Sequence, residues 1–83
     1  MNELSASDIL VLLKRNIEAG IKEKEETIKY AVNRQNYELA FYLDIKIRGQ
    51  KDIIYMIIEM LDQIWLAQES INEDFGLQLQ NSP

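Results

Sequence analysis

The stretch Asn33-Arg34-Gln35-Asn36 sets four polar residues side by side, and it decides the fold of this 83-residue chain. Asparagine tolerates left-handed backbone geometry and caps helices, so two asparagines within four residues favour a turn. The helical apolar pattern on both sides is interrupted here. Because a short loop makes sequential helices antiparallel neighbours, the stretch predicts a helical hairpin with its turn at about residues 34–37.

After the turn, core-type positions recur in alternating steps of four and three residues. This heptad spacing predicts one long helix over about residues 37–73. Gly76 is a plausible helix stop, so residues 74–83 are expected to form a frayed tail. The positions are Ala40, Leu43, Ile47, Gln50, Ile54, Ile57, Leu61, Ile64, Gln68, Ile71 and Phe75.

Before the turn, Ser5 or Ser7 provides a hydroxyl cap ahead of an apolar run, which predicts a first helix over about residues 6–34. Gly20 and Gly49 leave a choice open: they form a close-approach notch, a hinge that breaks the first helix near Gly20, or merely tolerated surface positions. The expected fold is a single all-α domain over residues 1–83, with one side of the first helix marked by Leu10, Leu13, Ile17, Ile21, Ile28 and Ala31.

Composition removes most catalytic chemistry. The chain has no cysteine and no histidine, so thiol catalysis, thiolate metal sites and histidine bases are excluded, and we expect no enzyme, cofactor or metal. With 14 acidic against 9 basic residues, the net charge of −5 disfavours direct binding to nucleic acid or to an anionic membrane. The first residues, Met1-Asn2-Glu3-Leu4-Ser5, lack the basic region and small-residue cleavage site of a signal peptide, so a cytoplasmic location is expected.

The second helix holds more apolar residues than one two-helix seam covers, which predicts self-association into a four-helix or larger bundle, or docking on a protein partner. Gln50 and Gln68 fall on core-type positions. Each amide is either buried, where it can fix the register of the helices, or at the edge of the seam in contact with water. The residues expected to form the oligomer or partner surface are Ile54, Ile57, Ile58, Leu61, Ile64 and Trp65.

The sequence over residues 31–48 resembles the UVR motif, a helical hairpin of nucleotide-excision-repair proteins and Clp-protease regulators. The matching positions are Ala31, Tyr37, Glu38, Ala40, Leu43 and Ile47, whereas Phe41, Asp44-Ile45 and Gln50 depart from the pattern. The resemblance implies a protein-binding hairpin whose elbow is held by Ala31, Tyr37, Ala40 and Leu43, with the aromatic ring packed back into the hairpin.

Three hypotheses for function follow from these observations. The first is a non-enzymatic interaction module, a homodimeric or larger assembly of hairpins that regulates or bridges a larger protein. The second is a small acidic inhibitor, of the kind that phages and mobile elements encode, which mimics nucleic acid towards a host nucleic-acid-binding or defence protein. The third is an oligomeric sponge for a small anionic nucleotide, held by Lys46, Arg48 or Lys51 with a stacking tyrosine.

Overall fold

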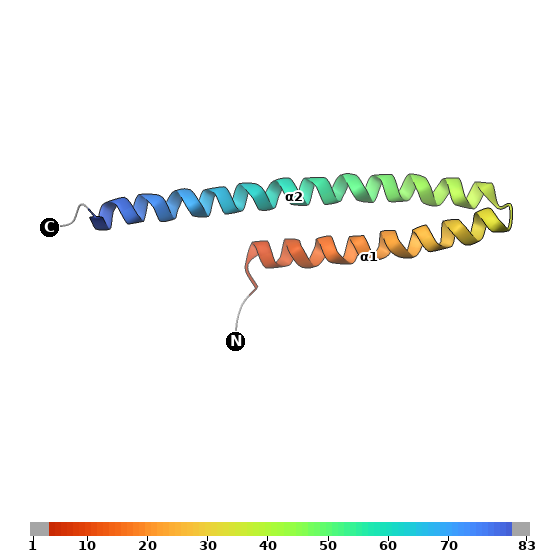
Figure 1. Ribbon diagram of the computed structural model, residues 1–83, viewed down its shortest axis with the longest axis horizontal. Coiled ribbons are helices and arrows are strands. Elements are labelled where there is room, and N and C mark those ends of the chain that lie inside the picture. The colour runs from red at the N-terminus through yellow and green to blue at the C-terminus, as the bar shows by residue number, and fades with distance from the viewer. Residues whose placement is uncertain (1–3, 81–83) are drawn as a thin grey trace.

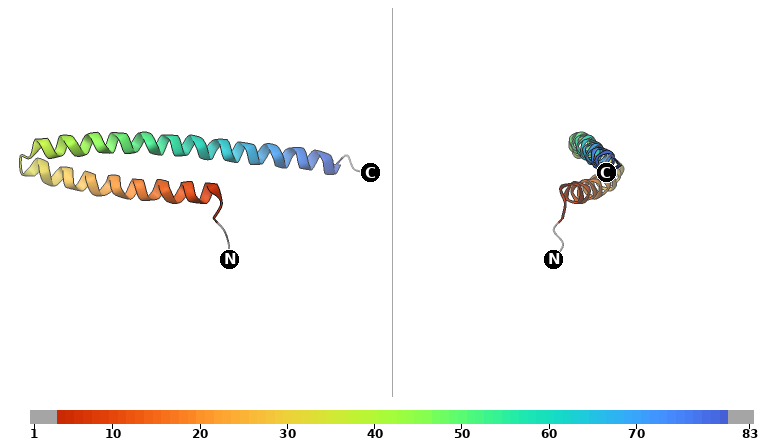
Figure 2. Two further views of the ribbon diagram at one scale, coloured as in Figure 1. Left: turned by 180° about the vertical axis from the view of Figure 1, so that it is seen from behind. Right: turned by 90° about the vertical axis from the view of Figure 1, so that its left-hand side faces the viewer.

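Two helices make up the fold, and they lie side by side along the long axis of the molecule (Figures 1 and 2). A computed structural model describes the backbone of residues 4–80 and the side chains of residues 4–71. Helix α1 spans Ala6–Asn33 and helix α2 spans Tyr37–Gln80. They run antiparallel in a rod of 75 × 27 × 13 Å, which confirms the predicted all-α hairpin.

Helix α1 begins at a reciprocal cap. The Asp8 backbone N–H donates to Ser5 Oγ at 3.1 Å, and the Ser5 backbone N–H donates to Asp8 Oδ2 at 3.3 Å. The first backbone N–H groups of a helix have no partner within it, so this capping box fixes where α1 starts. Of the two serines that the sequence offered, Ser5 is the cap.

The elbow between the helices joins two complementary ends. The N–H groups of Gln35 and Asn36 donate to the carbonyls of Val32 and Ala31, at 3.0 and 2.8 Å, the bonding pattern of a Schellman motif. Gln35 has φ 61°, the left-handed conformation that this motif requires and that glycine usually supplies. Asn36 then caps α2, since its Oδ1 accepts from the Leu39 N–H at 3.3 Å.

The two helices meet along a seam with a strict four-three repeat on each side, which we call the inner stripe. Among its members Ile21, Ala31, Ile47, Ile57 and Leu61 are fully buried. The others are half-buried along α1 at Ser7, Leu10, Lys14, Ile17, Lys24 and Ile28, and along α2 at Ala40, Leu43, Gln50, Ile54 and Ile64.

The structure decides one alternative that the sequence left open: helix α1 passes through Gly20 without a break. Two expectations need correction. Leu13 is exposed and Lys14 takes the seam position, since a lysine can lay its aliphatic stem along the partner helix with its amine towards water. Helix α2 continues past residue 73 and through Gly76 to Gln80, because a helical glycine costs only about 1 kcal/mol. Most of the predicted tail over residues 74–83 is therefore helical. Its last residues, 81–83, lie outside the described residues.

Helix α2 has 44 residues against 28 in α1, so its last turns extend beyond the start of α1 without a neighbour (Figure 1). We call the part of α2 that follows Trp65 the overhang, residues 66–80. Within it, Leu66 and Ile71 are exposed. An unpaired helix of this length is marginal in water, so the overhang depends on the rest of α2 for its helical state.

Candidate interaction surface

The six residues predicted as a partner surface do not lie together on the outside. Ile57 and Leu61 are buried against α1, and Ile54 and Ile64 are half-buried in the same seam. Only Ile58 and Trp65 are exposed. The heptad face of α2 is therefore already covered by α1, and of the six predicted residues only Ile58 and Trp65 remain open to a partner on the folded hairpin.

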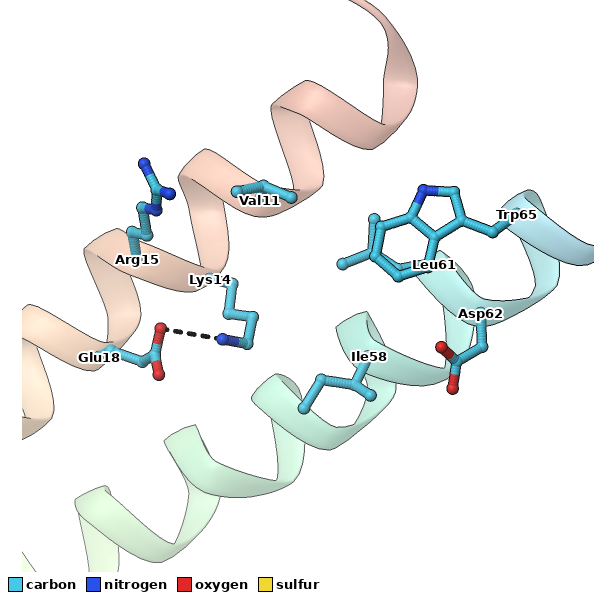
Figure 3. Close-up of a pocket in the computed structure, with 8 residues that line it drawn as sticks. All are labelled: Val11, Lys14, Arg15, Glu18, Ile58, Leu61, Asp62 and Trp65. Atoms are coloured by element: carbon cyan, nitrogen blue, oxygen red, sulfur yellow. Dashed lines mark hydrogen bonds and ion pairs between the residues drawn. The ribbon is translucent and has the colours of Figure 1, made fainter.

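A shallow groove of about 320 Å³ lies on one face of the hairpin, near the start of α1 (Figure 3). Four of its eight lining side chains are apolar and four are charged, and two of the charged ones form an ion pair, in which Lys14 Nζ lies 3.1 Å from Glu18 Oε1. We call this side the groove face. The side chains that line the groove are Val11, Lys14, Arg15, Glu18, Ile58, Leu61, Asp62 and Trp65.

The groove lining also shows which positions of each helix face this side of the hairpin and which face the other side. Val11 and Ile58 each follow a seam residue by one position, as Trp65 follows Ile64, and all three lie on the groove face. Residues that precede a seam position by one must then lie on the opposite face, because each step along a helix turns by about 100°. We call this side the stripe face.

The stripe face carries a second four-three repeat along α2, one residue before each seam position. Its large side chains, Leu39, Tyr42, Ile53, Met56 and Met60, are all exposed. We call this row the outer stripe; it runs through Leu39, Tyr42, Lys46, Gly49, Ile53, Met56 and Met60. Helix α1 adds exposed Ile9 and Leu13 to the same face, so an apolar surface crosses both helices.

The elbow residues named by the UVR resemblance divide into two groups. Ala31 is buried, and Ala40 and Leu43 are half-buried in the seam beside it. Tyr37 is 63% exposed, so its ring does not pack back into the hairpin as the resemblance implied. Its position at the first residue of α2 puts it outside the four-three repeat, which explains why it faces water.

The glutamines and glycines that the sequence singled out have different surroundings. Gln50 is half-buried, and its Oε1 is buried with no hydrogen-bond partner, whereas Gln68 is exposed. The Gln50 Nε2 lies 3.8 Å from the place where a Gly20 side chain would begin, which is an ordinary van der Waals distance, so the contact at Gly20 does not require glycine. Gly49 is exposed at a surface position.

Within the described part of the chain, no group of three acidic side chains gathers closely enough to bind a metal ion. No helix there is both apolar and long enough to cross a membrane. The arrangement offers apolar side chains and a few fixed charges, which suits binding to another protein surface. Comparison with known protein families, curated proteins and solved structures found no match to this chain.

Proposed function

We propose that this protein is a non-enzymatic interaction module, a helical hairpin that binds a second copy of itself and in that state contacts a larger protein. The observation that carries the proposal is the imbalance between core and surface. Five apolar residues are buried over residues 4–71, while nineteen large apolar side chains are exposed over the same residues.

This imbalance is unusual for a protein that acts alone. Soluble monomers rarely leave contiguous apolar areas larger than a few hundred Å² open to water, and such areas normally mark an interface. Exposed apolar residues lie on both helices of the stripe face and at the groove face around Trp65. Self-association covers one of these faces and leaves the other for a further partner, which fits a bridging role.

The proposal is tested by measuring absolute mass with light scattering over about 1 µM to about 1 mM protein, a range that spans typical dimer affinities. We expect twice the chain mass of 9.7 kDa at the higher concentrations, with little change between low and high salt, because the surface is apolar. A chain mass of 9.7 kDa throughout the range would contradict the proposal.

Thermal unfolding provides an independent readout. A protein that unfolds from an associated state becomes more stable as its concentration rises, since only the folded form binds the second copy. We therefore expect the Tm to rise over the same concentration range. A Tm that does not depend on concentration would show that the hairpin is stable alone and would count against self-association.

A further inference from the structure

The outer stripe of α2 contains both a gap and a side chain able to fill it. Gly49 is exposed, and nothing lies within 4 Å of the place where its side chain would begin. Seven residues later on the same stripe, Met56 is 61% exposed. Methionine is flexible and adapts to irregular spaces, so Met56 is suited to enter a gap on a facing surface.

The same stripe has matching charges. Lys46 lies on it and Glu59 borders it, and neither side chain makes an ion pair with any other described residue. The Lys46 amine rests 4.7 Å from the centre of the Tyr42 ring, within the exposed surface. A second copy of the stripe would offer each of these charges a partner of opposite sign.

The Gly49 gap and the charges of Lys46 and Glu59 are consistent with the same pairing of two α2 helices. When two identical helices pair antiparallel about a two-fold axis, residues equally distant from the axis face each other. Gly49 and Met56 are centred between Asp52 and Ile53, and so are Lys46 and Glu59. One register therefore places Met56 opposite Gly49 and Lys46 opposite Glu59, each twice.

We propose that two copies pair antiparallel through their outer stripes, with Met56 of each copy in the Gly49 gap of the other and Lys46 facing Glu59. This inference rests on the proposed self-association and names its surface. Helix α1 of each copy adds Ile9 and Leu13 beside the stripe, which gives a four-helix bundle. The half-exposed side chains supply on the order of 500 Å² of apolar surface per copy, which is more than half of the roughly 800 Å² that each partner buries in a stable interface of standard size.

The first test compares two neighbours of equal exposure. Tyr55 is 62% exposed and lies about 100° round the helix from Met56, outside the outer stripe. We expect Met56→Asp to weaken dimerisation at least about 100-fold, because the interface centre carries most of the energy, and Tyr55→Asp to change it less than about 3-fold. Equal effects of the two substitutions would overturn the inference.

The second test uses a substitution that improves the helix and harms the interface. Leucine is a better helix former than glycine, and the space around Gly49 within one copy is open, so Gly49→Leu suits the isolated hairpin. In the pair it occupies the gap for Met56, and we expect at least about 10-fold weaker association. Association that is unchanged or tighter would contradict the proposed register.

The third test fixes the geometry by disulfide formation, which is clean because the chain has no cysteine. Ile53 lies beside the two-fold axis, so Ile53→Cys should form a covalent dimer on oxidation, while Met60→Cys alone should not. A mixture of Lys46→Cys and Met60→Cys chains should crosslink to each other. In a parallel pair, Met60→Cys would crosslink with itself, and that result would overturn the inference.

These experiments separate the two proposals. A wild-type chain that stays monomeric removes the self-association on which everything here rests. A wild-type dimer in which Ile53→Cys fails to crosslink and Met56→Asp has no effect keeps self-association and overturns the outer-stripe surface.

Discussion

The inner and outer stripes of α2 are the same four-three pattern, displaced by one residue, yet they meet opposite surroundings. Leu61 in the inner stripe is 4% exposed, and its neighbour Met60 in the outer stripe is 48% exposed. The inner stripe is built of aliphatic residues with a single amide at Gln50, whereas the outer stripe mixes tyrosine, lysine, glycine and methionine. The first set suits a fixed seam, and the second an adaptable surface.

The largest expected effect comes from placing the same charge in each stripe. Leu61→Asp removes a buried side chain and leaves an unpaired carboxylate in the seam, which costs about 4 kcal/mol or more, close to the whole stability of a small domain. We expect circular dichroism to show loss of most helical signal. Met60→Asp should keep the helical signal and affect only association. An equal loss of helical signal in both variants would contradict the assignment of Leu61 to a buried stripe and of Met60 to an exposed one.

A smaller effect is expected where the inner stripe is imperfect. Gln50→Leu removes a buried amide oxygen that has no partner, so we expect the free energy of unfolding to rise by about 1–2 kcal/mol. For a chain of this size the Tm should rise by several degrees, about 4–8 °C per kcal/mol. Gln68→Leu is the matched control, because Gln68 continues the same repeat but is exposed, and it should leave the Tm nearly unchanged.

The smallest expected effect is at the elbow, which holds the inner stripe against α1. Gln35→Gly replaces a residue with φ 61° by the one that adopts this conformation without strain, so we expect a gain of about 0.5–1 kcal/mol in urea unfolding. Arg34→Gly is the control: Arg34 has φ −93°, so glycine there relieves nothing and should destabilise. A loss of stability in Gln35→Gly would contradict this account of the turn.

Local chemistry made most of the fold predictable. The polar cluster at residues 33–36 marked the turn because Asn36 can cap the following helix, and a serine ahead of the first apolar run marked its start. The α2 half of the seam followed from heptad spacing alone. Most of the α1 half followed as well, since five of its six predicted residues lie in the seam and only Leu13 does not. The seam positions of Lys14 and Lys24 were missed because apolar residues were favoured. The unbroken four-three spacing was the signal that could have found them; it runs through Leu10, Lys14, Ile17, Ile21, Lys24 and Ile28.

The interaction surface was less predictable, for a physical reason. Heptad spacing identifies residues that are expected to pack against another helix, but it does not say whether that helix belongs to the same chain or to another molecule. Ile57 and Leu61 satisfied the pattern and were covered by α1. The outer stripe satisfies it too, and its role depends on the rotation of α2 against α1, which the sequence pattern leaves open. The groove residues Val11 and Arg15 carried no signal in the sequence.

Trp65 lies beside the first turns of α1, at the point where α2 continues without a neighbouring helix. It is the single tryptophan of the chain. With 51% of its surface open to water, the indole lies partly in the groove, which Val11 also lines, and partly in solvent. Its fluorescence therefore reports on this one junction. A partner seated in the groove would shift the emission to shorter wavelength and slow quenching by iodide, whereas pairing on the opposite face would leave both unchanged, so the chain contains its own optical probe for which face is occupied.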